Sequence, residues 1–187
     1  MVYGMEILLI NISKMVVVYF LAWFLGAIIY ALVTHIAYVT IKRYSFGLHA
    51  LNSTVCTLVS CFLFAVVPWL VQGFEVGNIV VVMVFIHVII CLWLYAPADT
   101  KARPLVGKKL RVKLKVRAVL CGVVIMIVAL IVPNGSFKLL LILGAVYQAV
   151  SILPVTYKIL KRSEKNYEQY EQCAWRRQKG TSRKNGL

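Results

Sequence analysis

Five long apolar runs divide the chain, and they constrain its fold more than any other feature of the sequence. The runs extend over about Met15–Ile41, Ala50–Val71, Val76–Ala96, Ala118–Val132 and Phe137–Leu160. About 20 helical residues at a rise of about 1.5 Å each cross a hydrocarbon core of about 30 Å, and the first run is long enough to tilt or protrude. An extra re-entrant or interfacial segment near Ile7–Ser13 would change the side of the N-terminus without moving the loops. Because a bilayer offers backbone groups no water to bind, we expect each run to be helical.

The composition supports the same fold class. Apolar residues make up 61% of the chain and charged residues 14%, whereas soluble domains are about 45–50% apolar and about 25% charged. The sequence therefore predicts an all-α, polytopic integral membrane bundle of about five spans, within a range of about four to six. Pro97 and Pro133 close runs, whereas Pro68 and Pro154 lie inside runs and are expected to kink them.

The basic residues predict how the bundle is oriented. When the loops are assigned alternately to the two sides, 19 of the 21 Lys and Arg residues fall on one side, and only Lys14 and Lys138 fall on the other. The positive-inside rule then puts the N-terminus outside and the C-terminus in the cytoplasm. We expect one membrane-embedded domain over residues 1–160 and a flexible basic cytoplasmic tail over residues 161–187. The first run is too long for the apolar region of a cleavable signal peptide.

The charge and the scattered histidines and cysteines exclude several kinds of site. A net charge of +15 is compatible with nucleic-acid binding, but the basic blocks flank apolar runs, so anionic lipid headgroups or an acidic partner fit better. The cysteines show no metal-ligand spacing and no nucleotide-binding glycine pattern is present, so we expect neither a metal nor a cofactor. His35 and His87 lie inside apolar runs, where we expect interhelical hydrogen bonds.

A histidine and a cysteine, His49 and Cys56, lie seven residues apart near the start of the second run. On one continuous helix they would be separated by about 10 Å along the axis, too far for a hydrogen bond. A helix that begins between them, capped by Asn52 or Ser53, would let the chain fold back at Gly47 and would put Cys56 in the first turn. There the helix dipole and the imidazole would favour the thiolate of a cysteine peptidase. By itself, such a pair is more often an interfacial histidine and an inert packed thiol.

Two stretches of the sequence resemble the signatures of one membrane protein family. The first is Gly47-x-His49-Ala50-x5-Cys56, preceded by the basic pair Lys42-Arg43, and the second is the stretch from Tyr95 to Pro104. Together they resemble the accessory gene regulator protein B (AgrB) family over about residues 5 to 160 of the chain. The chain departs from longer members of that family in its short N-terminus and its long basic tail.

The resemblance implies an activity and a location. Members of the family are cysteine endopeptidases of Gram-positive cell membranes that process the precursor of a cyclic autoinducing peptide in quorum sensing. Carried over to this chain, His49 and Cys56 match the catalytic pair, which would face the cytoplasm together with the C-terminus. The implied substrate is an AgrD-like pro-peptide, which is cleaved through an acyl-thioester so that a thiolactone or lactone ring can form.

Other residues around the predicted site have two interpretations each. Asp99 either orients His49 or binds the precursor, together with Arg43 and Gly47, or it merely caps a helix end after Pro97. The basic residues of the second cytoplasmic loop either dock an acidic precursor tail or only set topology and bind lipid headgroups. The residues assigned to docking are Lys101, Arg103, Lys108, Lys109, Arg111 and Lys113. Basic and apolar residues alternate from Arg111 to Arg117, which favours a short extended segment there.

Functions without peptidase chemistry stay open at this point. A small transporter or exporter, or a membrane scaffold whose tail recruits acidic proteins, would also be a basic, polytopic chain. The scarcity of intramembrane charges argues against an ion-coupled carrier. The sequence leaves open whether the chain forms a homodimer.

Overall fold

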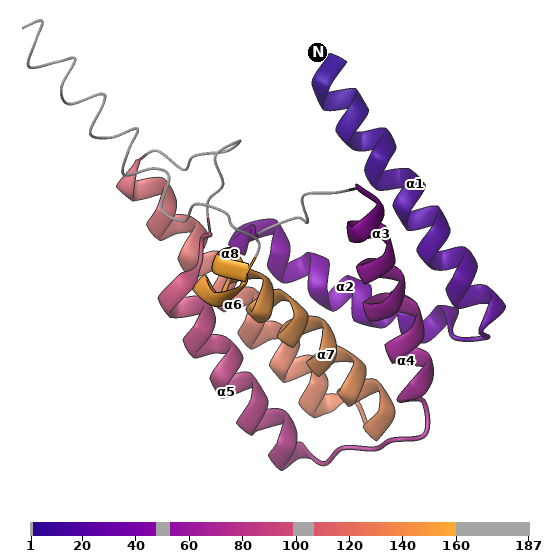
Figure 1. Ribbon diagram of the computed structural model, residues 1–187. Coiled ribbons are helices and arrows are strands. Elements are labelled where there is room, and N and C mark those ends of the chain that lie inside the picture. The colour runs from indigo at the N-terminus through magenta and orange to yellow at the C-terminus, as the bar shows by residue number, and fades with distance from the viewer. Residues whose placement is uncertain (1, 48–52, 99–106, 160–187) are drawn as a thin grey trace, which may run out of the picture.

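The computed structural model describes residues 2–47, 53–98 and 107–159, which form a bundle of helices (Figure 1). In chain order the helices are α1 (Val2–Phe24), α2 (Ile28–Ser45), α3 (Ser53–Cys61), a π-helix η1 (Phe62–Val66), α4 (Val67–Leu70), α5 (Asn78–Tyr95), α6 (Lys108–Ile131), α7 (Gly135–Ile152) and α8 (Pro154–Ile159). Within these ranges the extended pairing is limited to one isolated bridge, so the predicted all-α fold class is confirmed.

The first apolar run forms two helices, and our prediction of one span there is wrong. Helix α1 ends in a Schellman-type turn, in which the amides of Gly26 and Ala27 donate to the carbonyls of Trp23 (2.9 Å) and Ala22 (2.8 Å). Gly26 has a φ of 67°, which glycine adopts without steric cost. The chain then turns back, so the start of α1 lies at the end of the bundle where α2 finishes and α3 begins (Figure 1). The prediction that the N-terminus lies outside assumed one span in this run, so it no longer follows.

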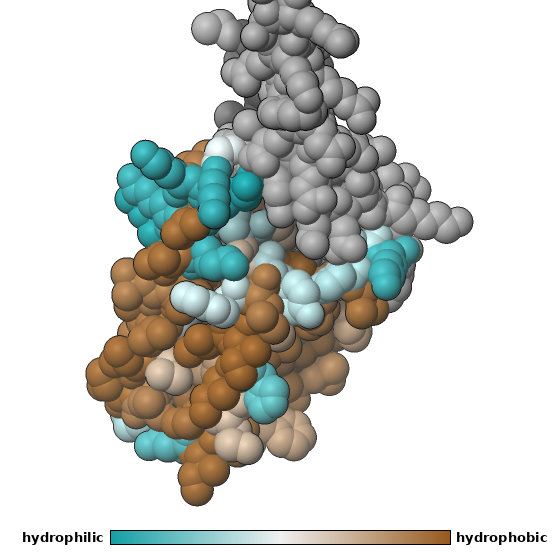
Figure 2. All heavy atoms as spheres, turned by 90° about the vertical axis from the view of Figure 1, so that its left-hand side faces the viewer, coloured by the Kyte–Doolittle hydropathy of each residue, from teal (hydrophilic) through white to brown (hydrophobic). Residues whose placement is uncertain are grey.

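The exterior of the bundle is apolar. Helices α5, α6 and α7 are each long and apolar enough to cross a membrane, and the segments Ile12–Phe24 and Thr54–Leu70 are shorter apolar helices. Large apolar side chains stand out from the surface, and Figure 2 shows them as a broad brown face below a hydrophilic end. Ile79, for example, is 81% exposed. A soluble monomer does not expose contiguous apolar surface on this scale, whereas lipid covers it, so the helices form a membrane bundle.

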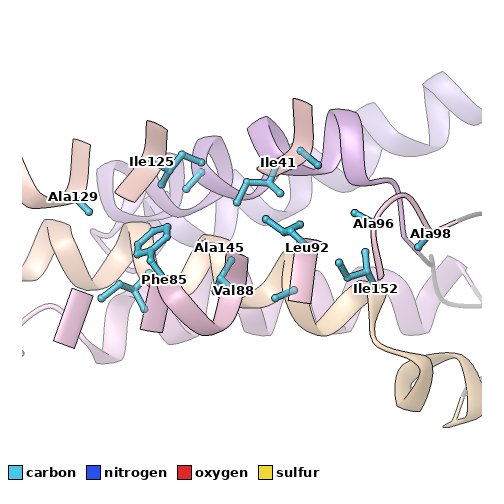
Figure 3. Packing of buried hydrophobic residues seen from close by; sticks show 14 of the residues in the cluster. Ile41, Phe85, Val88, Leu92, Ala96, Ala98, Ile125, Ala129, Ala145 and Ile152 are labelled. Carbon is cyan, nitrogen blue, oxygen red and sulfur yellow. The ribbon is translucent and has the colours of Figure 1, made fainter. Parts of the chain in front are cut away.

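The core lies between α2, α5, α6 and α7, where Ile41, Phe85 and Leu92 are fully buried (Figure 3). Helices α2 and α7 approach each other closely at Gly144. A Cβ atom added there would lie 2.5 Å from the carbonyl oxygen of Thr34 and 2.7 Å from the Cβ atom of Ala37. Small residues that let two helix backbones approach are a common basis of packing in membrane bundles.

The prolines lie at the ends and interruptions of helices, as predicted from the sequence. Pro97 and Pro133 follow the ends of α5 and α6. Pro154 separates α7 from α8, and Pro68 follows the π-helix η1, which interrupts the helix at that point. Proline lacks an amide hydrogen and crowds the carbonyl four residues earlier, which explains both irregularities. The predicted kinks are therefore confirmed, the one at Pro154 as a complete break.

Helix α6 begins at Lys108, ten residues before the run predicted to start at Ala118, so the extended segment expected over Arg111–Arg117 is wrong. The alternating basic side chains are accommodated on the helix through contacts with aromatic rings. The Lys115 ammonium lies 5.9 Å from the ring of Trp93, and the Arg117 guanidinium lies 5.8 Å from the ring of Tyr44. Such cation–π contacts let long basic side chains lie along an apolar surface.

Candidate functional site

Cys56 occupies the first turn of a helix. Helix α3 begins at Ser53, so Cys56 is its fourth residue, and its side chain is partly exposed. That a helix begins between His49 and Cys56 stays a prediction, because residues 48–52 lie outside the described residues. The first turn of a helix has unpaired backbone N–H groups and the positive end of the helix dipole, which both favour a thiolate. His49 and Asn52 themselves lie outside the described residues.

A basic side chain from the neighbouring helix lies close to Cys56. The Lys42 ammonium donates to the Tyr38 hydroxyl at 2.5 Å, and it lies 4.7 Å from the centre of the same ring. Both groups are near enough to Cys56 to interact electrostatically with it. We did not assign these two residues a role from sequence, although their spacing of four puts them on one face of the helix that leads into the motif.

The two stretches that resemble family signatures meet at the end of α2. The amide of Ala98 donates to the carbonyl of Ser45 at 2.9 Å, and Phe46 pairs with Ala98 as an isolated parallel bridge. Figure 3 shows Ala96 and Ala98 together near Ile152, at one end of the core. The segment that leads to His49 in the sequence therefore lies beside the segment that leads to Asp99, although Asp99 lies outside the described residues.

The backbone reverses direction immediately before the segment that contains His49. Phe46 has a φ of 58° and Gly47 a φ of 113°. Gly47 is buried against α7, where an added Cβ atom would lie 2.7 Å from the hydroxyl of Ser151 and 3.4 Å from the amide nitrogen of Gln148. The expectation that Gly47 takes backbone angles closed to other residues is confirmed. Gln148 and Ser151 were not singled out from the sequence, although polar side chains inside an apolar run often form hydrogen bonds between helices. The partners of the Gln148 amide could not be predicted, because they lie 103 and 102 positions away in the chain.

Most of the basic side chains at the start of α6 are exposed. Lys108, Lys109 and Lys113 are exposed and Arg111 is half-buried. Arg43, in the last turn of α2, is also exposed. Hydrophilic atoms gather at one end of the bundle in Figure 2. Lys101 and Arg103, which were predicted to share the docking role, lie outside the described residues, as does the tail predicted over residues 161–187.

The two intramembrane histidines differ. His35 forms a hydrogen bond between its Nδ1 atom and the hydroxyl of Tyr19 at 2.6 Å, which links α2 to α1 as predicted. His87 instead pairs its Nδ1 atom with the carbonyl of Met83 in its own helix at 2.8 Å, so an interhelical role is wrong for this residue. Across the described ranges no three His, Cys, Asp or Glu residues lie close enough together to hold a metal ion.

Comparison with known proteins settles the family. Residues 1–152 match the family described as accessory gene regulator B. The chain belongs to this family. It is 40% identical to an AgrB-like protein of Listeria innocua over 90% of this chain and 83% of that protein. It is 41% identical to an AgrB-like protein of Clostridium acetobutylicum, over 90% and 80%. It is 31% identical to the accessory gene regulator protein B of Staphylococcus intermedius, over 81% and 80%. No solved structure matches.

Proposed function

We propose that this AgrB-family protein is a membrane-embedded cysteine endopeptidase that cleaves the precursor of a cyclic autoinducing peptide at the cytoplasmic side of the membrane. Family membership supports a role in accessory gene regulator quorum sensing. The observation that carries the proposed chemistry is the position of Cys56, which lies in the first turn of α3 close to the Lys42 ammonium of α2. A thiol in such electropositive surroundings is suited to act as a nucleophile.

The proposed reaction has two steps. The Cys56 thiolate attacks a peptide bond of the AgrD-like precursor, and a thioester forms while the C-terminal fragment leaves as a free amine. His49 takes the thiol proton and then gives it to that amine. In the second step a cysteine or serine side chain within the precursor attacks the thioester, so that a thiolactone or lactone ring closes and the Cys56 thiol is regenerated.

The energetics of the two steps say what the site must do. The exchange of one thioester for another is nearly balanced, whereas the replacement of an amide by a thioester is unfavourable. Cleavage therefore proceeds only if the released fragment is removed and water is kept from the acyl-enzyme. The apolar side chains that cover the exterior of the bundle support a membrane location, which limits the access of water.

The other polar groups have supporting roles in this proposal. Lys42, held by Tyr38, stabilises the thiolate before attack. The exposed basic residues of α6 attract the acidic tail of the precursor, and Asp99 and Arg43 orient His49 or bind the precursor backbone. The distribution of Lys and Arg along the chain supports a cytoplasmic position for all of these groups and for the C-terminus.

The test compares two cysteines of one helix. The full chain is co-expressed with an epitope-tagged AgrD-like precursor, as wild type, as Cys56→Ala and as Cys61→Ala. Cys61 ends α3, more than one turn after Cys56, and serves as the matched control. Cleavage should disappear in Cys56→Ala and persist in Cys61→Ala. If the membrane-inserted Cys56→Ala protein still releases the C-terminal fragment, the proposed peptidase mechanism is wrong.

A further inference from the structure

One fully buried amide in α7 holds the end of α2. Gln148 has no exposed surface, and its Nε2 atom donates to the Ser45 hydroxyl at 2.7 Å and to the Phe46 carbonyl at 2.6 Å. These two residues are the last of α2 and the first after it. The next residue, Gly47, packs against the same helix beside Ser151, whose hydroxyl in turn donates to the carbonyl of Gln148 at 2.8 Å. Helix α7 therefore fixes three consecutive residues of the chain just before the segment that contains His49.

The buried amide of Gln148 destabilises the fold in one respect, which indicates that it does more than fill space between α2 and α7. The Oε1 atom of Gln148 is buried and has no hydrogen-bond partner among the described residues. A buried polar atom without a partner destabilises the folded protein, and an apolar side chain of the same size would avoid that cost. The contact between α2 and α7 does not need a polar group either, because Gly144 already brings the two backbones together.

The two hydrogen bonds act where the backbone is most unusual. Ser45 already has an acceptor of its own, since its hydroxyl donates to the Ile41 carbonyl at 2.9 Å. The bond to the Phe46 carbonyl, by contrast, holds a non-glycine residue at a positive φ of 58°. Residues in such conformations persist only where their surroundings enforce them. Gln148 thus enforces the angle at which the chain leaves α2.

We propose that Gln148 is a positioning residue for the catalytic histidine, because its amide sets the direction in which the chain runs from Phe46 through Gly47 toward His49. This inference rests on the proposed peptidase function. Gln148 touches neither reacting group in this proposal, and it acts only through the segment that it holds. Loss of the amide would let the chain leave α2 in other directions and would weaken the activation of the Cys56 thiol that the proposed function assigns to His49.

The test measures the thiol directly and needs no substrate. In the full chain, inserted in membranes, the other four cysteines are replaced, and the rate at which fluorescein iodoacetamide alkylates Cys56 is followed from acidic to alkaline pH. The rate at neutral pH follows the thiolate fraction. We expect Gln148→Met to lower that rate about tenfold, which corresponds to about 1.4 kcal/mol. Tyr147→Phe is the matched control, because it removes a neighbouring buried hydroxyl that has no hydrogen-bond partner among the described residues.

A double-mutant cycle separates positioning from general stability. In the presence of His49→Ala, Gln148→Met should cause no further loss of alkylation rate, because there is no imidazole left to position. If Gln148 has a purely structural role, Gln148→Met should lower the alkylation rate, or the thermal stability of the inserted protein, by the same factor in the wild-type and His49→Ala backgrounds. Gln148→Asn, whose amide is too short to reach both acceptors, repeats the cycle if Gln148→Met fails to insert.

The outcomes distinguish this inference from the proposed function. If His49→Ala slows alkylation but Gln148→Met matches wild type, or acts equally in both backgrounds, the positioning role is wrong and the peptidase proposal stands. If His49→Ala leaves the rate unchanged, the histidine does not activate the thiol, and both proposals fall.

Discussion

The substitution Gly47→Ala tests whether the turn before His49 must have its observed geometry. Gly47 has a φ of 113°, which is outside the regions open to alanine, and strain of this kind costs about 1–3 kcal/mol. The new Cβ atom would also lie 2.7 Å from the Ser151 hydroxyl. Rotation of that hydroxyl would break its bond to the Gln148 carbonyl, at a cost of about 0.5–1.5 kcal/mol. The local penalty is therefore about 1.5–4.5 kcal/mol.

Gly107→Ala supplies a control with matched strain. Gly107 has a φ of 107°, but nothing lies within 4 Å of the position that its Cβ atom would take. Both variants therefore carry the same kind of backbone strain, and only Gly47→Ala adds a clash beside the segment that leads to His49. In a co-expression assay with the tagged precursor, Gly47→Ala should cleave about two- to tenfold more slowly than Gly107→Ala, because the clash alone costs about 0.5–1.5 kcal/mol and a tenfold loss corresponds to about 1.4 kcal/mol.

A second substitution identifies the source of the loss. Ser151→Ala removes the hydroxyl that the new Cβ atom would meet, so the double variant Gly47→Ala/Ser151→Ala should recover part of the activity while it keeps the backbone strain. Equal cleavage by correctly inserted Gly47→Ala and Gly107→Ala proteins would refute the reasoning that this turn positions the site.

Three further predictions concern packing, docking and topology. Gly144→Leu should lower the thermal stability of the protein in detergent by about 1–3 kcal/mol or prevent insertion, because the backbones of α2 and α7 touch there. In the control Gly122→Ala the new Cβ atom would meet only side-chain carbons, at 3.0 Å in Leu92 and 3.8 Å in Ile89, so this variant should be tolerated. Equal stability of the two variants would contradict the packing described. Replacement by glutamine of four basic residues of α6, Lys108, Lys109, Arg111 and Lys113, should raise KM for the precursor more than it lowers kcat, and should make KM less dependent on salt. An unchanged KM would limit these residues to lipid and topology roles. Reporter fusions after Gly107 and Leu187 should be cytoplasmic and one after Asn134 external, and an exported Gly107 fusion would reverse the proposed orientation.

Local chemistry explains which features could be predicted from the sequence. Proline is disfavoured in the interior of a helix, so the ends of α5 and α6 and the break at Pro154 followed from residue type. The helical conformation of the segment that contains Cys56 followed from its place in an apolar run. The turn at Gly26 could not be found by hydropathy, because apolar residues continue through it and membrane-facing turns need not be polar.

Long-range contacts explain what could not be predicted. The Gln148 amide donates a hydrogen bond to the Phe46 carbonyl across 102 positions of the chain, and no local sequence pattern predicts that pairing. Lys42 was visible as part of a basic pair, but its contact with Tyr38 and its nearness to Cys56 depend on how α2 and α3 pack. The candidate nucleophile was therefore accessible from the sequence, whereas the groups around it required the structure.

Mass spectrometry of the enzyme trapped with its precursor tests the central claim most directly. The full chain is co-expressed with the AgrD-like precursor and quenched in acid, which preserves thioesters, and the peptide that contains Cys56 is examined. We predict that it carries the N-terminal part of the precursor as a hydroxylamine-sensitive adduct, and that the adduct is absent from Cys56→Ala and present in Cys61→Ala. Precursor cleavage without any adduct on Cys56, or with the adduct on another cysteine, would contradict the proposed acyl-thioester mechanism.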